Sequence, residues 1–160
     1  MAILSGNLPQ TSGDGDLFIT DGGIETTLIF REVLQLPLFA AFPLLKTEQG
    51  THALQKYYHT YAGIARQYGT GFVLESATWR SSSDWGTQLG YSAGELDSAN
   101  RKAIAMLHEV REHSVKEGCR KLVVSGCFGP RGDGYSPRSR MSVDQAREYH
   151  SRQAKLFREE

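Results

Sequence analysis

Short apolar segments alternate with longer amphipathic segments along this chain, and this alternation restricts the fold more than any other feature of the sequence. The apolar segments are residues 17–20, 72–74 and 121–125. The amphipathic segments, in which apolar side chains recur every three or four positions, are residues 47–68, 92–116 and 142–157. Strands that alternate with helices pair in parallel through right-handed crossovers. The sequence therefore predicts an α/β fold whose parallel sheet is built from three β/α units.

The middle apolar segment, residues 72–74, indicates where a binding site is expected. It follows Gly69 and Gly71 and shows no polar alternation, which is typical of a strand buried on both faces of a sheet. Polar side chains come directly after it, among them Glu75 and Thr78. In α/β folds the carboxyl ends of the strands form the ligand-binding edge. We therefore expect the loops after all three strands to face one site.

The loop after the first strand contains Asp21, Gly22 and Gly23. Consecutive glycines let the backbone turn sharply and approach a ligand closely. A carboxylate at Asp21 would then face the space that the strand ends enclose. The alternative is an ordinary turn in which Asp21 caps the next segment.

The ends of the three predicted helices have recognisable signals. Gly69 stands just beyond the first amphipathic segment, at a position where helices commonly end in a left-handed residue. Ser92 with Glu95, and Ser142 with Gln145, have the spacing of capping boxes. These signals favour helices that begin near residues 92 and 142.

Two segments that connect the predicted strands and helices show no clear hydrophobic period. Residues 25–45 could begin as a helical turn, but Pro37 and Pro43 exclude a long helix there. Residues 81–90 are polar apart from Trp85 and Leu89, and we expect a loop.

Composition and charge exclude several functional classes. The chain of 160 residues is 39% hydrophobic with a formal net charge of zero, which disfavours a nucleic-acid or membrane partner, since both reward a basic surface. No apolar run approaches the roughly 20 residues that a membrane helix needs. Residues 1–16 lack the pattern of a secretory signal and are expected to be a flexible lead-in to a domain over residues 17–160. A cytoplasmic location is the simplest expectation.

The two cysteines, Cys119 and Cys127, fit a reducing compartment. About eight extended residues of roughly 3.3 Å each separate them, too far for a disulfide. Their spacing matches no zinc motif, so we assign no metal ligand to either.

Three β/α units are too few to close a barrel, which needs eight. A sheet of three strands would have exposed edges, which proteins normally cover. Either the chain is an unusually small open sheet or it is part of something larger, and the second is expected. Exposed edges would also favour self-association.

Four stretches, residues 21–28, 58–71, 78–82 and 125–133, together resemble the homocysteine S-methyltransferase family. The first resembles the family's opening Asp-Gly-Gly segment, and the last resembles its third strand with a Gly-Pro loop. The resemblance extends from about residue 17 to residue 160. It implies a (β/α)₈ barrel of which this chain contains the first three units, a truncated form of the fold.

The resemblance also implies the chemistry and some of the site. The family holds zinc by three cysteine thiolates, and the metal activates the homocysteine thiol for attack on a methyl donor. Neither Cys119 nor Cys127 matches those ligand positions, so we expect no catalytic or metal-binding residue in this chain. Asp21, with Gly22 and Gly23, matches a substrate-contacting position.

Two further substrate-binding residues are predicted. Thr78 matches a hydroxyl position in the family's substrate pocket. Glu75 is inferred from its place at the strand end, where its carboxylate would hold an amino group or position a partner. A salt bridge from Glu75 to Arg80 or to a neighbouring loop is an equally good interpretation. Trp79 either forms a wall of the pocket or packs in the protein interior.

Three hypotheses stay open. The chain is the amino-terminal part of a zinc-dependent methyltransferase that takes a homocysteine-like thiol and a methyl donor, and it is inactive alone. Alternatively it is a truncated, non-catalytic fragment or partner-bound partial barrel. A third hypothesis is another eight-stranded barrel enzyme that uses a carboxylate base without zinc. The methyl donor is not determined, because its contacts are expected from loops outside this sequence.

Overall fold

Three parallel strands form the centre of the computed structural model, which describes residues 17–135 and 140–159. They are β1 (Phe18–Ile19), β2 (Gly71–Glu75) and β3 (Leu122–Ser125), in the order β1-β2-β3. Phe18 lies opposite Gly71, and Phe72 lies opposite Leu122. The predicted α/β fold with a parallel sheet is confirmed. The predicted lead-in, residues 1–16, lies outside the described residues.

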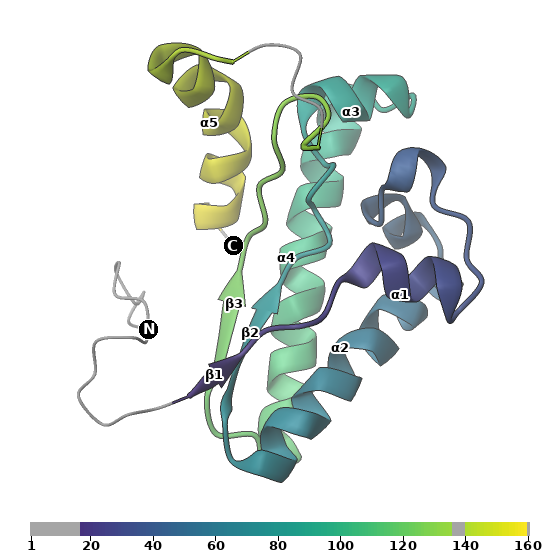
Figure 1. Cartoon of the computed structure of the whole chain (residues 1–160), viewed down its shortest axis with the longest axis vertical. Helices are drawn as coiled ribbons and strands as arrows, with labels where there is room; N and C mark the ends of the chain where they lie inside the picture. The colour runs from purple at the N-terminus through teal and green to yellow at the C-terminus, as the bar shows by residue number, and fades with distance from the viewer. Residues whose placement is uncertain (1–16, 136–139, 160) are drawn as a thin grey trace.

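Long helices follow each of the three strands (Figure 1). The long helices are α2 (Glu48–Tyr68), α4 (Ala93–Lys116) and α5 (Val143–Glu159). Shorter helices occupy the connections that showed no period: α1 (Ile24–Phe30), η2 (Pro37–Phe39), η3 (Phe42–Lys46) and α3 (Ser83–Gln88). The three predicted helices are therefore confirmed, within a residue or two of their expected ends.

Helix α3 corrects one prediction, because residues 81–90 were expected to be a loop. Its only buried residue is Gly86, against which Leu96 of α4 packs so closely that an added Cβ would lie 2.8 Å from a Leu96 methyl carbon. A six-residue helix with a single buried residue leaves no apolar period in the sequence, which is why periodicity missed it.

The helix ends follow the predicted capping signals. The Ser92 hydroxyl accepts from the Glu95 N–H at 3.3 Å, and the Glu95 carboxylate accepts from the Ser92 N–H at 2.8 Å. The same reciprocal pair joins Ser142 and Gln145. Gly69 ends α2 in the left-handed conformation, with φ 67°. Only the cap suggested for Asp21 is wrong, since α1 begins after Gly23 without a side-chain cap.

The main core lies between the sheet and the two helices α2 and α4, and Figure 1 shows α4 behind the strands and α2 to their right. Phe72 and Leu74 of β2 are fully buried there, as are Leu54 of α2 and Leu107 of α4. The other face is less covered: Val73 is half-buried, and so are all four residues of β3. The expectation that β2 is buried on both faces is therefore correct for only one face.

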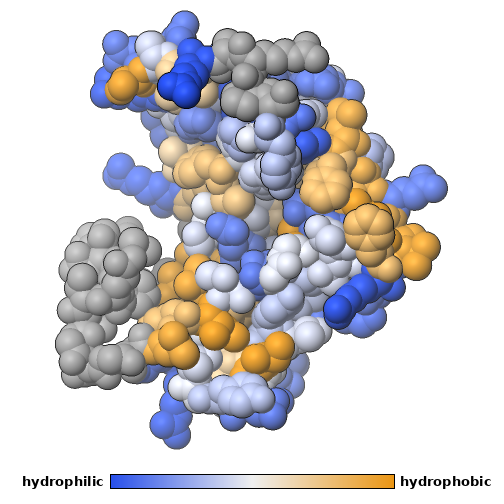
Figure 2. Space-filling view, in the orientation of Figure 1, coloured by the Kyte–Doolittle hydropathy of each residue, from blue (hydrophilic) through white to orange (hydrophobic). Residues whose placement is uncertain are grey.

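Exposed apolar side chains lie on α1 and on the loop after it, in the region shown at the right of Figure 2. Phe30 and Val33 are 75% and 82% exposed. Across the described part of the chain, every helix is too short or too polar to cross a bilayer.

Candidate functional site

A cavity of about 320 Å³ opens at the carboxyl ends of the strands. The loops after β1, β2 and β3 all contribute to it, as expected for a parallel sheet. Its walls come from Thr20, Asp21, Gly23, Ile24, Glu25, Glu75, Ser76, Trp79 and Cys127. The wall therefore contains three carboxyl groups and one thiol, with no basic side chain among these residues.

Asp21 is held in the cavity by a tyrosine from α2. The Tyr57 hydroxyl donates a hydrogen bond of 2.9 Å to Asp21 Oδ2. Burial raises the pKa of Asp21, although the Tyr57 hydrogen bond opposes that shift. Tyr57 is only 5% exposed, so it packs in the core as its spacing predicted and also fixes the carboxylate. The second role was not visible from the spacing.

Glu25 is the functional candidate that sequence reasoning missed. It lies in the first turn of α1, is 8% exposed, and its Oε1 has no hydrogen-bond partner within the described residues. Burial raises the pKa of Glu25 most, and the negative charges of Asp21 and Glu75 add to the shift, whereas a backbone hydrogen bond and the positive charge of Arg80 oppose it. The available signal was its spacing: Glu25 lies three residues before buried Leu28 and therefore shares its helix face.

Glu75 ends β2, and its backbone carbonyl accepts a 2.7 Å hydrogen bond from the Tyr58 hydroxyl. Burial, and then the charge of Asp21, raise the pKa of its carboxyl group, which the neighbouring Cys127 thiol contacts. Burial also raises the pKa of the Cys127 thiol, to about 12, with Glu75 adding to the effect. At neutral pH the Cys127 thiol is therefore mostly protonated, which makes it a weak nucleophile.

Thr78 is fully buried and joins two loops. Its hydroxyl donates to the Cys127 carbonyl at 2.8 Å and lies 2.7 Å from the Ser76 hydroxyl, which accepts from the Cys127 N–H at 2.9 Å. These hydrogen bonds fix the loop after β3 against the loop after β2. Thr78 is not among the residues that line the cavity, so a direct substrate contact there stays a prediction.

Gly22 and Gly23 shape the backbone around Asp21. Gly23 has φ 98°, a conformation that favours glycine, and it lines the cavity. At Gly22 an added Cβ would lie 2.7 Å from the Tyr61 hydroxyl, so a side chain there would force the Tyr61 side chain to move. Of the predicted site residues, Asp21, Gly23 and Glu75 line the cavity, whereas Gly22 and Thr78 are not among its lining residues.

Aromatic side chains surround Trp79, the one aromatic residue among the described residues of the cavity wall. Trp79 lines the cavity, and its ring meets the rings of Phe39 and Tyr135 edge-on at centroid distances of 6.4 Å. The Arg80 guanidinium lies over Trp79 at 4.9 Å and over Trp85 at 4.1 Å. The Arg80 guanidinium is thus stacked on aromatic rings. It also donates a hydrogen bond to the Leu38 carbonyl.

The described residues do not provide a metal site. Within residues 17–135 and 140–159, no three His, Cys, Asp or Glu side chains are arranged to hold a metal ion. Both cysteines are free, and Cys119 is buried away from the cavity wall. The zinc implied by the family resemblance is therefore not matched by a set of donors here.

Comparison with known proteins identifies the family to which this chain belongs. The sequence model of the family described as homocysteine S-methyltransferase matches residues 18–160. The chain belongs to the homocysteine S-methyltransferase family. No curated protein sequence shows significant similarity to it.

Solved structures agree with the fold. The oxidized form of the homocysteine methyltransferase MmuM from Escherichia coli is 19% identical with a TM-score of 0.72, covering 90% of this chain and 49% of that one. The metallated form is 17% identical with a TM-score of 0.68, covering 90% of this chain and 50% of that one. This family member therefore spans about half the length of the structures that it matches.

Proposed function

We propose that this chain is the substrate-binding half of a homocysteine S-methyltransferase, which transfers a methyl group from a donor to a homocysteine-like thiol. The proposal includes a (β/α)₈ barrel whose first three units lie in residues 17–160. Family membership and the three-carboxylate cavity at the strand ends support it. The two free thiols fit the reducing environment of the cytoplasm, which is the location we propose.

The carboxylates would bind the amino group of the substrate. A cavity wall with Asp21, Glu25 and Glu75 and without a basic side chain favours a cationic guest. Tyr57 orients Asp21 before the substrate arrives, which reduces the ordering that binding requires. The unpartnered Oε1 of Glu25 is available as a further acceptor. Thr78 would act indirectly, by holding the loop after β3 against the loop after β2.

No metal-dependent step is assigned to this chain. The expected zinc of the whole enzyme needs a set of donors that the described residues do not supply. The proposal therefore limits this half of the barrel to binding and orienting the thiol substrate. Alone, it is expected to be inactive.

Binding of L-homocysteine to the purified chain tests the proposal. In calorimetric titrations, Asp21→Ala is expected to weaken binding by about tenfold or more, the cost of losing a hydrogen bond to a charged group. Asp84→Asn is the matched control, because Asp84 is half-buried and pairs with Arg131 outside the cavity. Thermal unfolding confirms that each variant folds. Equal affinity of Asp21→Ala and the parent chain would contradict the assignment.

A non-catalytic role is the second candidate, because one observation favours it. Strand β3 pairs only with β2 among the described strands, and its residues are only half-buried. Such an edge suits a partial barrel that is completed by another chain or by a second copy. Methyltransferase activity of the isolated chain, without another chain or a second copy to complete the barrel, would contradict this alternative.

A further inference from the structure

Three residues other than glycine have a left-handed backbone conformation, and all three lie in the segment that follows α1. They are Val33, Leu38 and Phe39, with φ of 57°, 53° and 55°, and the described part of the chain contains no others. A Cβ atom is unfavourable in this conformation, above all on a β-branched residue such as Val33. Such strain persists only where surrounding contacts enforce it, and it gathers at binding sites and switches. We refer to residues 33–39 as the strap.

Burial of the strap does not account for this strain. Val33 and Leu38 are 82% and 42% exposed, so their side chains gain little from the conformation. Leu36 is the one fully described strap residue that is buried, and the Phe39 N–H donates a local hydrogen bond of 2.9 Å to its carbonyl. The contacts that enforce the strained conformation must therefore come from another part of the chain.

Arg80 supplies these contacts. Its guanidinium donates a hydrogen bond to the Leu38 carbonyl and lies 5.8 Å from the centroid of the Phe39 ring. The same guanidinium lies 4.9 Å from the Trp79 ring and 4.1 Å from the Trp85 ring. A planar guanidinium donates within its plane while its faces rest on rings, so one side chain joins the strap to both tryptophans.

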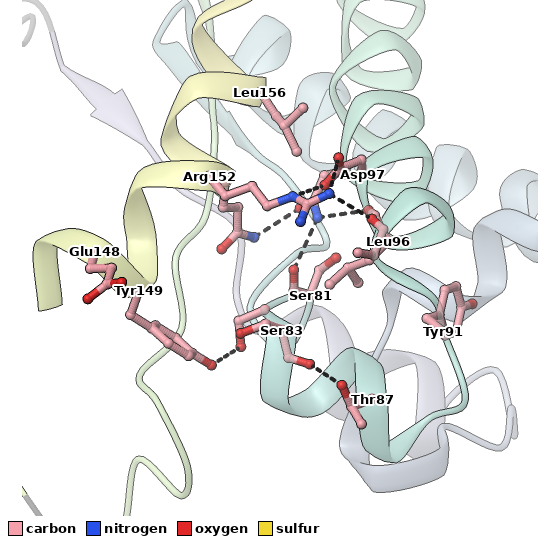
Figure 3. A pocket seen from close by; sticks show the side chains of 14 residues that line it. Ser81, Ser83, Thr87, Tyr91, Leu96, Asp97, Glu148, Tyr149, Arg152 and Leu156 are labelled. Atoms are coloured by element: carbon pink, nitrogen blue, oxygen red, sulfur yellow. Dashed lines mark hydrogen bonds and ion pairs between the residues drawn. The ribbon is translucent and has the colours of Figure 1, made fainter. Parts of the chain in front are cut away.

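The backbone next to Arg80 is fixed from α4 and α5. A second cavity, of about 280 Å³, lies between α3, α4 and α5, and Ser81 and Ser82 line it (Figure 3). The Asn100 amide donates to the Ser81 carbonyl at 3.1 Å, and the Tyr149 hydroxyl donates to the Ser82 hydroxyl at 2.8 Å. Figure 3 shows both hydrogen bonds. Arg80 is therefore mounted on a rigid base, whereas the strap is largely exposed.

The strap reaches the carboxylate cavity through Trp79. This residue lines the cavity, and Phe39 meets its ring edge-on at a centroid distance of 6.4 Å. The Trp79 backbone is closely packed, because a Cβ added at Gly129 would lie 1.8 Å from the Trp79 carbonyl oxygen. The ring is the part that can adjust, and Phe39 supports it from the side of the strap.

We propose that Arg80 is a positioning residue that latches the strap onto the Trp79 wall of the carboxylate cavity. With the latch closed, Phe39 supports the Trp79 ring and the cavity keeps its shape for a ligand. With the latch open, the left-handed residues relax and the ring loses this support. The strap is thus a movable part of the cavity wall, and its effect on substrate rests on the proposed function.

Hydrogen exchange measured by NMR tests the latch without a ligand. The amides of Leu34 and Phe39 report on the strap, because they donate to the carbonyls of Leu28 and Leu36. Arg80→Met is expected to exchange about tenfold faster at both amides than the parent chain, with α4 unchanged.

Arg66→Met is the matched control for this experiment. Arg66 also donates to the backbone carbonyl of a distant segment, that of Glu117 at 3.2 Å, but it lies outside the cavity wall. Its removal should leave the strap amides at the parent rate. Equal exchange at the strap in Arg80→Met and Arg66→Met would overturn the proposal.

Val33→Gly is a second variant with the opposite expected effect, and it decides the question if Arg80→Met misfolds. Glycine adopts φ 57° without a clash, and the exposed Val33 side chain has little contact to lose. The variant should slow exchange at the strap by about threefold and raise Tm by about 2–4 °C. Exchange as fast as in the parent chain, or faster, would show that the strap is not strained.

Calorimetric titration with L-homocysteine separates this inference from the proposed function. Loss of the Arg80 charge by itself would favour the cationic amino group, whereas an open latch should weaken binding, by about threefold or more. Equal or tighter binding by Arg80→Met than by Arg66→Met would therefore overturn the positioning role. A parent chain that does not bind homocysteine would contradict the proposed function, and the exchange rates would then decide on the latch alone.

Discussion

At the scale of the residue, the distinctive feature is the set of three carboxyl groups in one cavity. Asp21 and Glu75 were predicted from their place after two strands, and the structure brings both to the same wall. Glu25 joins them because the first turn of α1 buries it against the core. Burial raises the pKa of all three carboxyl groups, and repulsion by neighbouring carboxylates raises the pKa of Glu25 and Glu75 further. Without a cationic ligand, this arrangement costs stability at neutral pH.

Glu25→Gln should therefore stabilise the unliganded chain at pH 7, by about 1 kcal/mol or roughly 2–4 °C in Tm. The folded-state pKa of Glu25 lies above its ordinary value of 4.5, so the folded state binds the proton more tightly. Stability is then lost as pH rises through the folded pKa. The gain from the variant is expected at neutral pH and should vanish below about pH 4.5.

Thermal unfolding between pH 4 and pH 7 measures this difference. The exposed Glu112 of α4 provides the matched control, and Glu112→Gln should leave the pH dependence close to that of the parent chain. A Glu25→Gln variant that is less stable than the parent at pH 7 would show that Glu25 has a stabilising partner.

At the scale of the element, α4 contributes to both the main core and the second cavity. Leu107 packs in the core, whereas Leu96 and Asn100 line the cavity. Its first turn is fixed by the reciprocal hydrogen bonds of Ser92 and Glu95. The same hydrogen bonds lower the pKa of the exposed Glu95 carboxyl group. The capping box thus positions the end of the helix that forms the cavity wall.

Ser92→Ala is expected to lower the free energy of unfolding by about 1 kcal/mol, because the Glu95 N–H loses its acceptor. Denaturant unfolding measures the change. Ser98→Ala on the same helix is the control, since the Ser98 hydroxyl bonds only to the Gly94 carbonyl four residues earlier. Equal losses in the two variants would mean that the capping box contributes nothing beyond an ordinary helix serine.

At the scale of the whole molecule, the main feature is the unpaired edge of β3, which could bind a further strand. The carbonyls of Lys121 and Ser125 accept hydrogen bonds from β2, so strand alternation turns the N–H of Val124 toward the open edge. In a complete barrel such an edge would be paired. The proposed self-association uses this edge in the isolated chain.

Sedimentation over a range of concentrations should therefore show reversible association of the isolated chain. Val124→Pro removes the outward N–H while leaving the bonds to β2, because proline is tolerated on an open edge. The variant should shift association to about tenfold higher concentration, a change of roughly 1.4 kcal/mol. A parent chain that stays monomeric at every concentration would contradict self-association.

The sequence alone determined the parallel β/α order, the three long helices and the position of Asp21 and Glu75 at the strand ends. Each of these depends on short-range signals: apolar period, capping residues, and polar groups directly after a strand. The family resemblance was likewise visible in the ordered motifs, and the family match over residues 18–160 confirms it.

Only the tertiary structure decided which polar groups are buried and what they face. It buried Glu25 beside Asp21, turned Thr78 into the contact between two loops, and made α3 a helix through Leu96. It also formed the second cavity, in which Ser81 meets residues of α5 some 70 positions later. These features depend on packing between distant segments, and local sequence patterns contain no record of such contacts.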